Sequence, residues 1–240
     1  VLPAVIEARN AGFARAVVPI ESVGEATLVS DIEVGGAHSL SEVARWLKGE
    51  CVLDTVCEMR AVPADPVADM ADVVGQSEAR HVLEIAAAGS HHVMMTGPPG
   101  IGKTMLARRL PGILPPLDAE ESLEVTALHS IAGRLRPGQP LITAPPFVAP
   151  HHSTSTTALI GGGTGMARPG AVSLAHRGIL FLDECAEMGP KVLDSLRQPL
   201  EEGEVRISRR DGVAAYPARF QLLLAAIHCP TRLSKAHSVT

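Results

Sequence analysis

Hydrophobic positions along the chain fall into short continuous runs and longer stretches with helical spacing. Continuous apolar runs predict buried strands, and on this basis strands are expected at residues 92–95, where the apolar run begins at Val93, and at 179–182 and 222–227. Apolar residues three and four positions apart predict amphipathic helices, and this spacing occupies residues 77–88, 104–110 and 190–202. Strands that alternate with helices favour an α/β fold in which a mainly parallel sheet is the middle of three layers.

The first 59 residues carry a separate pattern of shorter elements. We expect a helix at 2–10, a short strand at 16–20 and a second helix from Ser39 to about Lys48. Ser39 is the predicted N-cap of this second helix, because Glu42 stands three residues later and completes a capping box. The apolar side of the helix is expected to be buried, and it consists of Leu40, Val43, Ala44 and Leu47.

Two further segments are recognised by composition and turn signals. Residues 60–72 contain two prolines and three aspartates without apolar periodicity, which is typical of a linker. Residues 205–208 and 213–220 resemble strands, and Asp211-Gly212 between them is a good hairpin turn signal. The sequence therefore predicts a β-hairpin before the last buried strand, and a polar tail at 231–240 after it.

Composition restricts the class of protein. The 240 residues are 46% hydrophobic and 20% charged, which is typical of a globular chain rather than a disordered one. Aromatic residues make up only 2%, so the core is expected to be aliphatic. The net charge of −5 gives no overall attraction to nucleic acid, so any such contact needs a local basic patch or an assembly that concentrates such patches.

The sequence carries no recognisable targeting signal. No apolar run approaches the roughly 18 residues that cross a bilayer, and the N-terminus lacks the basic and apolar regions of a signal peptide. The four cysteines show no CxxC spacing, so we expect reduced thiols in a cytoplasmic protein. The chain starts at Val1 and ends in a polar tail directly after an apolar strand, which indicates part of a longer protein.

The sharpest motif follows the predicted strand at 92–95. Its eight residues match the P-loop pattern GxxxxGK[ST], and they are Gly97, Pro98, Pro99, Gly100, Ile101, Gly102, Lys103 and Thr104. The glycines let backbone N–H groups approach phosphate oxygens, and the following helix presents its N-terminus to the same phosphates. Lys103 is expected to bind the β- and γ-phosphates, and the Thr104 hydroxyl to be a Mg²⁺ ligand. The motif therefore predicts a site for ATP with Mg²⁺.

A second acidic motif follows the predicted strand at 179–182. Asp183 comes directly after this strand, at the carboxyl edge where open α/β sheets bind ligands, and we expect it to bind Mg²⁺ directly or through water. Glu184 is expected to polarise the attacking water as general base, so Glu184 and Lys103 are the predicted catalytic residues. Acids at a strand end are common on protein surfaces, and the P-loop upstream is what favours a functional role here.

From about residue 69 to 230 the chain resembles the AAA+ module of magnesium-chelatase-related ATPases, and specifically the competence-protein branch of ComM/YifB type. Besides the P-loop and residues 105–117, the resemblance depends on Asp72-Val73-Val74-Gly75-Gln76, Ala149-Pro150-His151-His152-Ser153, Gly161-Gly162-Gly163, Arg168-Pro169-Gly170, Ser173-Leu174-Ala175-His176 and Leu196-Arg197-Gln198-Pro199-Leu200-Glu201. The resemblance implies a P-loop AAA+ core over residues 73–230 that binds ATP and Mg²⁺. It also implies self-association into a ring, with a hexamer expected for the full-length protein.

The family fold implies positions for further segments. Val74 and Gly75 are expected beside the adenine. Residues 161–176 are implied to form an insert before the second acidic motif, and residues 205–220 a hairpin; in related ring ATPases such loops face the central pore. Residues 1–59 resemble, less specifically, the C-terminal part of a Lon-protease-like (S5-like) α+β domain, and no proteolysis is expected from them.

The sequence departs from the family pattern in two respects. Where the family ends a strand with Asn-Pro-Cys-Pro-Cys, this chain has Ile227-His228-Cys229-Pro230-Thr231. Ile227 therefore replaces the asparagine that would orient the attacking water, and an isoleucine side chain cannot hydrogen-bond a water. The helical lid that normally supplies arginines to the γ-phosphate is missing from these 240 residues. The resemblance thus implies ATP binding, with hydrolysis impaired.

A basic cluster in the predicted hairpin suggests a nucleic-acid contact. Arg206, Arg209 and Arg210 are candidates for binding DNA phosphates, and the competing interpretation is a solvated hairpin tip. Tyr216 is the single aromatic residue nearby, which argues against recognition by base stacking.

Two pairs of adjacent histidines are candidates for metal binding, but polar positions in surface loops are the favoured interpretation. Adjacent residues on a strand point to opposite faces, so such a pair chelates poorly. The pairs are His91-His92 and His151-His152.

Three functions agree with the sequence. The favoured one is an Mg²⁺-ATP-binding module of a ComM/YifB-type ring motor that acts on DNA. The second is the motor subunit of a magnesium chelatase that inserts metal into a porphyrin, against which the Lon-like segment argues. The third is a truncated nucleotide-binding relic without turnover.

Overall fold

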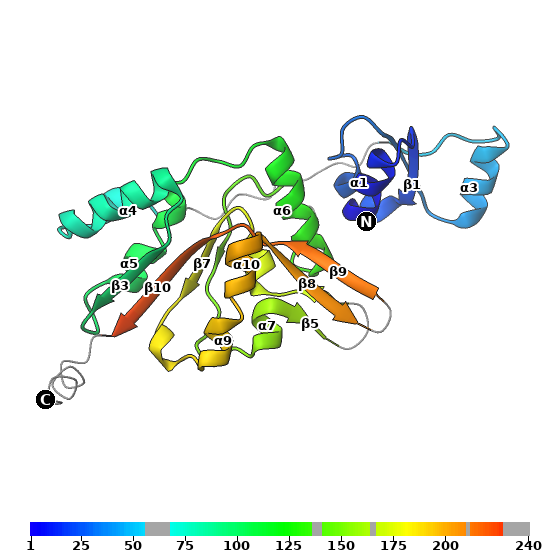
Figure 1. Ribbon diagram of the computed structural model, residues 1–240. Coiled ribbons are helices and arrows are strands. Elements are labelled where there is room, and N and C mark those ends of the chain that lie inside the picture. The colour runs from blue at the N-terminus through cyan, green and yellow to red at the C-terminus, as the bar shows by residue number, and fades with distance from the viewer. Residues whose placement is uncertain (56–67, 136–140, 164–166, 210–211, 228–240) are drawn as a thin grey trace, which may run out of the picture. The chain divides into compact units, whose positions relative to one another are not determined.

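The computed structural model describes residues 1–55, 68–135, 141–163, 167–209 and 212–227 (Figure 1). The chain forms two compact units, of which the first is Val1–Asp65 with Leu117–Thr143 and the second is Pro66–Pro116 with Ala144–Thr240. Residues 117–143 thus belong to the first unit, although in sequence they stand inside the expected AAA+ core. The domain boundaries proposed above, at 59, 72 and 230, stay sequence predictions.

In its described residues, the first unit combines a two-stranded sheet with four helices. Its strands β1 (Arg15–Pro19) and β2 (Glu33–Ala37) pair in parallel. Its helices are α1 (Leu2–Asn10), α2 (Val23–Ala26), α3 (Leu40–Leu47) and α6 (Ala119–Ile131), with a 3₁₀ turn at Ile20–Ser22. The core of this unit contains the buried residues Leu2, Val5, Val18, Val23, Ala26, Val29, Ile32, Val34 and Leu123.

The capping of two helices can be compared with the sequence pattern. At α3, the Ser39 hydroxyl accepts a hydrogen bond from the Glu42 N–H at 3.4 Å, which confirms the predicted N-cap. The predicted burial of the apolar side of α3 is wrong, because Leu40 and Leu47 are 86% and 73% exposed. Apolar spacing identifies the apolar side of a helix but not what covers it. Helix α6 was not expected from the sequence, although a capping box precedes it.

The second unit is built on a four-stranded parallel sheet with strand order β3-β10-β7-β4. These strands are β3 (Val93–Gly97), β10 (Gln221–Ile227), β7 (Ile179–Leu182) and β4 (Phe147–Val148). Because all four run in the same direction, their carboxyl ends meet at one edge of the sheet. The P-loop follows β3, and Asp183 follows β7, at this same edge.

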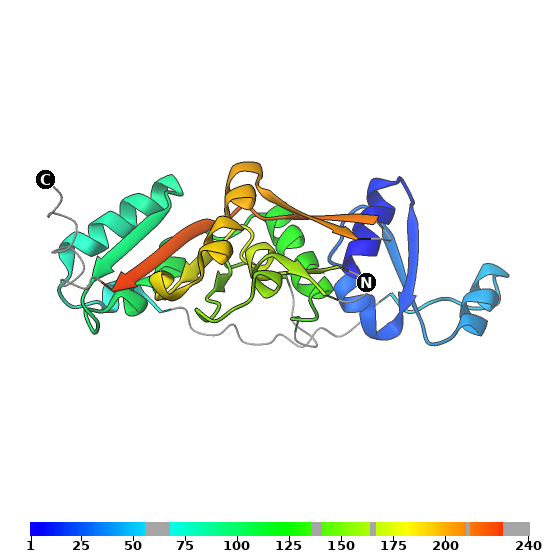
Figure 2. The same ribbon diagram turned by 60° about the horizontal axis from the view of Figure 1, so that its bottom comes forward.

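Strand β7 inside the sheet is buried on both faces, as expected for the middle layer of three. Helices α4 (Ser77–Gly89) and α5 (Lys103–Ala107) cover one face, and the core there contains Leu83, Ala87, Leu106, Ala107, Phe181 and Leu223. On the opposite face of β7, Leu180 and Leu182 are fully buried as well. The predicted three-layer α/β fold with a mainly parallel sheet is therefore confirmed (Figures 1 and 2).

The remaining elements of the second unit are short. They are α7 (Thr156–Ile160), β5 (Gly161–Gly162), β6 (Arg168–Pro169), α8 (Ala171–Leu174), α9 (Pro190–Asp194), α10 (Arg197–Glu202), β8 (Glu204–Arg209) and β9 (Gly212–Pro217), with 3₁₀ turns at Met70–Asp72, Leu110–Ile113 and Cys185–Glu187. Strands β8 and β9 pair in antiparallel fashion and confirm the predicted hairpin, which Figure 2 shows as a separate ribbon beside α10. The turn residues 210–211 lie outside the described residues, as does the tail at 231–240.

Two sequence predictions in this unit need correction or comment. The single helix predicted at 190–202 is wrong, since the chain forms α9 and α10 instead. Pro199 has no N–H for the Ser195 carbonyl, and its ring would clash with that carbonyl in a continuous helix. Met70, at the end of the predicted linker, is buried with 2% exposure in the core of the second unit. No helix in the described part of the chain is long and apolar enough to span a bilayer.

Candidate functional site

The predicted P-loop connects β3 to α5. Gly97 ends the strand and Gly102 is the N-cap of the helix. Gly100 and Gly102 have φ angles of 79° and 93°, a left-handed conformation that glycine adopts without strain. A Cβ on Gly100 would meet no atom within 4 Å, so the backbone conformation rather than crowding requires glycine at that position.

The Lys103 ammonium group lies against the loop that precedes it. Its Nζ donates hydrogen bonds to the carbonyl oxygens of Gly97 at 2.8 Å and Pro98 at 2.9 Å. The loop thereby holds the positive charge close to its own backbone. Because the ammonium group has three donors and rotates freely, it can exchange these carbonyls for phosphate oxygens without leaving the loop.

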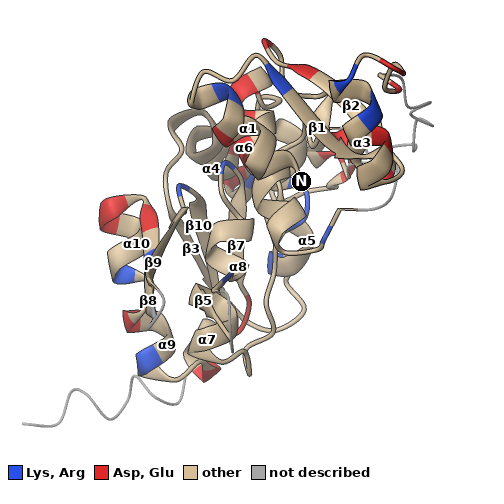
Figure 3. Cartoon of the chain, turned by 90° about the vertical axis from the view of Figure 1, so that its right-hand side faces the viewer, with Lys and Arg blue, Asp and Glu red and all other residues tan. Residues whose placement is uncertain are grey.

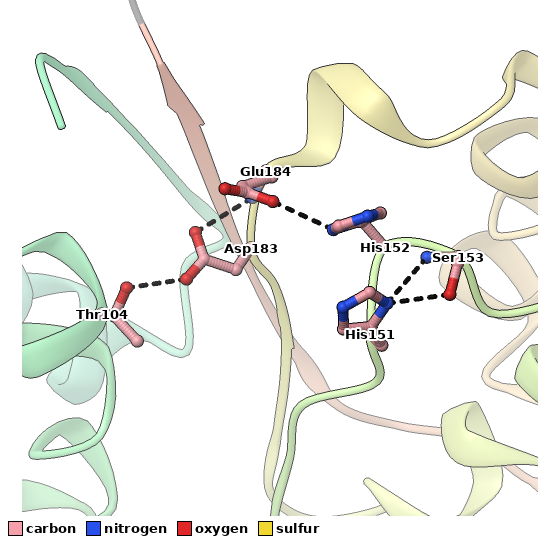
Figure 4. Close-up of polar contacts among 6 residues, drawn as sticks. All are labelled: Thr104, His151, His152, Ser153, Asp183 and Glu184. Carbon is pink, nitrogen blue, oxygen red and sulfur yellow. Dashed lines mark hydrogen bonds and ion pairs between the residues drawn. The ribbon is translucent and has the colours of Figure 1, made fainter.

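The two predicted magnesium ligands meet across 79 residues of sequence. The Thr104 hydroxyl donates a hydrogen bond of 2.7 Å to Oδ2 of Asp183 (Figure 4). The other carboxylate oxygen, Oδ1, accepts the N–H of Glu184 at 2.9 Å. Thr104 comes from α5 and Asp183 from the end of β7, and parallel pairing of β3 and β7 with β10 brings these two ends together. The pair presents a hydroxyl and a carboxylate, the hard oxygen donors that Mg²⁺ prefers.

Glu184 turns toward a different partner. Its φ is 50°, so the chain turns sharply after Asp183. Oε2 of Glu184 lies 2.9 Å from Nδ1 of His152, which follows β4 (Figure 4). Val148 pairs with Leu180, so His152 and Glu184 each stand four residues beyond paired positions of adjacent strands. This contact was not predicted, although His152 lies in a stretch that carries the family resemblance.

An open pocket of about 670 Å³ lies along β3, α4 and the P-loop. Lys103, Ile101, Thr96, Gln76 and Ser77 are among its lining residues. Its volume is in the range of small-molecule sites. The side-chain amide of Gln76 donates to the carbonyl oxygen of Ile101 and so ties the start of α4 to the P-loop.

The residues expected beside the adenine lie outside the lining of this pocket. Val74 is 97% exposed, and Gly75 has a left-handed φ of 76°. Gln76, which was missed as a site residue, follows them directly and does line the pocket. The sequence did contain a signal for Gln76, because it carries a polar amide and directly follows the Val-Gly pair that was expected beside the adenine.

Ile227 occupies the last position of β10, opposite Gly97 at the start of the P-loop. It is 44% exposed. Position 227 is therefore next to the P-loop, as expected for the residue that replaces the family asparagine. The side chain at this position is aliphatic. His228 and the residues after it lie outside the described residues.

The basic residues of the hairpin are accompanied by acidic ones. Nε of Arg206 lies 2.5 Å from Oε1 of Glu204, and this hydrogen bond is the main cause that raises the pKa of Arg206 above its ordinary value. Figure 3 shows acidic residues on α10 close to the hairpin. Arg209 ends β8, and Arg210 lies outside the described residues. Part of the predicted basic cluster is therefore neutralised by its own neighbours.

The histidine pairs do not form a metal centre with other side chains of the described residues, among which no group of three His, Cys, Asp or Glu has suitable geometry. Nδ1 of His92 accepts the Leu222 N–H at 3.0 Å, a structural role between β10 and β3. The His151 and His152 rings lie 4.0 Å apart between centroids, with an interplanar angle of 38°.

Comparison with known proteins identifies the family. The family model described as magnesium chelatase, subunit ChlI, matches residues 69–239. An uncharacterised protein of Mycobacterium tuberculosis, Rv2897c, is 60% identical over 230 residues, which cover 96% of this chain and 46% of the relative. Competence protein ComM of Haemophilus influenzae is 42% identical over 236 residues, again 96% of this chain and 46% of the relative. The chain thus spans about half the length of the curated relatives it matches.

Among solved structures, NtrX from Brucella abortus in complex with ATP has a TM-score of 0.46 and 21% sequence identity, over 70% of this chain and 33% of the NtrX chain. A likeness at this level carries no argument about function. The match to the family model covers the P-loop, the Asp183 motif and the strands β3 and β7 that these motifs follow. The chain therefore belongs to the magnesium-chelatase family of AAA+ P-loop proteins and is similar to its competence-protein ComM branch.

Proposed function

We propose that this chain binds ATP together with Mg²⁺ at the edge of the sheet formed by the P-loop and Asp183. The observation that carries the proposal is the 2.7 Å hydrogen bond between Thr104 and Asp183. A P-loop hydroxyl and a strand-end carboxylate converge at this edge next to the Lys103 ammonium group. Positive charge, backbone N–H groups and hard oxygen ligands then surround the place of a metal-bound triphosphate.

Each residue of the site has a separate task in this proposal. Backbone N–H groups of residues 97–104 and the Lys103 ammonium group bind phosphate oxygens. Thr104 and Asp183 hold Mg²⁺, which when bound neutralises charge on the phosphates. Glu184 accepts a proton from the attacking water as general base. The pocket along β3 takes the nucleoside, with Gln76 and Ser77 among its lining residues.

Hydrolysis by the described site is proposed to be slow. Ile227 stands where a polar side chain would orient the water, and its aliphatic side chain offers neither a donor nor an acceptor. Nucleotide binding does not need this group, because the phosphates are bound by the loop. We therefore infer that the site binds nucleotide well and turns it over poorly.

In the whole protein, we propose a ring motor of ComM type that acts on DNA in the cytoplasm. The relative named competence protein is 42% identical over 96% of this chain, including the first unit. Self-association would gather copies of the β8–β9 hairpin around one axis, and so concentrate arginines that a single negatively charged chain presents weakly.

A magnesium-chelatase motor is the second candidate, because the matching family model carries that description. That match begins at residue 69, whereas the similarity to ComM extends through the first unit. The first unit therefore favours the competence-type motor. If the protein inserted metal into a porphyrin together with a chelatase partner subunit, the magnesium-chelatase motor would become the first candidate.

The experiment is a nucleotide-binding titration with Mg²⁺–ATP, comparing the native chain with Lys103→Ala and with the control Lys191→Ala on the exposed surface of α9. A lost charge-assisted hydrogen bond is worth about 1.5–3 kcal/mol, so Lys103→Ala is expected to weaken binding by roughly ten- to a hundredfold. Lys191→Ala should bind like the native chain. Equal affinity of the native chain and Lys103→Ala would refute the proposed function.

A further inference from the structure

The segment that contains α6, residues 117–143, interrupts the second unit in the sequence. The residues on either side of it belong to the second unit, whereas the α6 segment itself belongs to the first. The Leu117 N–H donates a hydrogen bond of 2.9 Å to the carbonyl oxygen of Thr143. The two ends of the α6 segment are therefore joined, and both of its connections to the second unit start from one place.

A buried threonine holds the described part of the α6 segment together. The Thr126 side chain is fully buried. Its hydroxyl donates to the carbonyl oxygen of Ser122 at 2.6 Å and accepts the N–H of Ile142 at 2.9 Å. The first bond lies within α6, and the second ties the returning chain to the helix. The polar residue that interrupts the apolar period of α6 thus closes the segment on itself.

The α6 segment contributes to the hydrophobic core of the first unit. Leu123 is 7% exposed and lies in the core cluster that α1, α2, β1 and β2 also form. Ala127 and Leu141 pack against the same cluster. Beside it, the Ser130 hydroxyl donates a hydrogen bond to Glu25 of α2. Docking of the α6 segment removes apolar area of both partners from water, so it stabilises the first unit.

The connection from the P-loop helix to the α6 segment is short and stiff. Leu110, three residues after α5, is fully buried in the core of the second unit. Leu114 follows in extended conformation, with φ of −80° and ψ of 149°. Pro115 and Pro116 come next, and consecutive prolines form a semi-rigid spacer because each ring fixes φ. A displacement of α5 therefore reaches the α6 segment with little loss.

The returning connection carries a second proline pair and is fixed to β7. Pro145 and Pro146 stand directly before β4. The Pro146 carbonyl oxygen accepts the N–H of Ile179, the first residue of β7, at 2.8 Å. A Cβ on Gly178 would lie 2.1 Å from that oxygen, so this close approach requires glycine. The returning connection is thus bound to the strand that ends at Asp183.

The two connections lead to the two elements that carry the proposed magnesium ligands. Thr104 belongs to α5, and Asp183 follows β7. When both side chains hold Mg²⁺–ATP, α5 and β7 are fixed relative to each other, and so are the starts of both connections. We propose that the α6 segment couples the nucleotide site to the first unit, so that Mg²⁺–ATP binding and docking of the segment favour each other. The inference rests on the proposed ATP-binding function and adds the first unit as its effector.

The first test concerns docking in the nucleotide-free chain. Trp46 is the single tryptophan and belongs to α3 of the first unit, so its fluorescence in urea follows unfolding of that unit. Leu123→Ala is expected to shift this equilibrium toward the unfolded state by at least about thirtyfold, the lower end for buried leucines. The control Ile131→Ala changes an exposed residue at the end of α6 and should shift it far less. An unchanged transition in Leu123→Ala would overturn the proposal.

The second test repeats the urea titration with Mg²⁺ and a non-hydrolysable ATP analogue, and binding is measured on the same sample. We expect the Trp46 transition to shift toward the folded state by about fivefold or more, the range of coupling between sites. Bound analogue with an unchanged transition would overturn the coupling. Absence of binding would refute the proposed function and the coupling with it, while docking would still be decided by the first test.

The third test makes the outgoing connection flexible. Pro115 and Pro116 are exposed, so replacing both by glycine removes no buried contact. This double variant should bind the analogue like the native chain and lose the nucleotide-dependent shift of the Trp46 transition. Comparison with and without nucleotide cancels the effect of glycine on the unfolded chain. The control Pro217→Gly, at an exposed position of β9, should keep the shift. A full shift in the double variant would exclude the stiff connection as the route.

Reciprocity gives an independent readout, because two coupled equilibria change each other by the same factor. Leu123→Ala should therefore weaken binding of the Mg²⁺–ATP analogue by the factor with which the analogue stabilises the first unit, although Leu123 lies outside the nucleotide site. Ile131→Ala should bind like the native chain. Equal affinity of Leu123→Ala and the native chain would contradict the coupling.

Discussion

Replacement of Thr104 by valine tests the metal site with the smallest change in shape. Valine keeps the β-branched form of threonine and loses only the hydroxyl group. In the nucleotide-free protein, this removes the 2.7 Å hydrogen bond to Asp183. Hydrogen bonds to charged groups contribute about 1.5–3 kcal/mol when buried. Both residues are only partly buried, so we expect the free energy of unfolding to fall by about 1 kcal/mol.

The effect on nucleotide binding should be larger and should depend on Mg²⁺. Loss of one of the two protein ligands is expected to weaken Mg²⁺–ATP binding by roughly tenfold or more. Substitution of residues that only support a metal ligand already lowers metal affinity by about ten- to a hundredfold. Binding of ATP in the presence of a chelator should match the native chain, because the phosphate contacts of Lys103 and the loop remain.

The assay is calorimetric titration of ATP with and without Mg²⁺, and the quantity compared is the ratio of the two affinities. The control Thr157→Val makes the same chemical change on the exposed surface of α7. If Thr104→Val kept the native ratio, the hydroxyl would not be a metal ligand. The interpretation of the Thr104–Asp183 pair as a magnesium site would then be refuted.

Three further outcomes follow from the described contacts. Ile227→Asn should raise the rate of ATP hydrolysis by about tenfold or more in a single-turnover assay, because an amide can orient the water; a rate equal to that of the native chain would exclude a role for this position. Arg206→Ala should lower the slope of log affinity against log salt for duplex DNA by about 0.9, the value for one phosphate contact, and an unchanged slope would remove Arg206 from the DNA interface. Burial is the main cause that raises the pKa of the Cys185 thiol, so less thiolate is present at a given pH. Iodoacetamide labelling followed by mass spectrometry should therefore modify Cys185 more slowly than the more exposed Cys51, and faster labelling of Cys185 would contradict its burial.

Two local signals in the sequence compete with the apolar spacing around them. Helix α6 was missed although Asp118 and Glu121 form a capping box before it, because Ser122 and Thr126 interrupt its buried side and obscure the apolar period. Pro199 divides the helix predicted at 190–202. In both cases capping residues or a proline, and not the apolar spacing, decide where the helix begins and ends.

The sequence by itself determined the parts of the site whose physics is local. A strand, a glycine-rich turn and a helix follow one another within residues 93–107, so backbone preferences alone predict the P-loop. The four apolar residues before Asp183 predict a strand buried on both faces, and hence an acid at the edge of the sheet. Membership of the family follows from the same motifs.

Only the tertiary structure decided which of these ends come together. The strand order β3-β10-β7-β4 brings Thr104 to Asp183 and the end of β10 to the P-loop. The register of β4 against β7 brings His152 to Glu184. Periodicity reports whether a face is buried, but it carries no information about which strand lies beside another, because pairing depends on contacts between residues far apart in the chain.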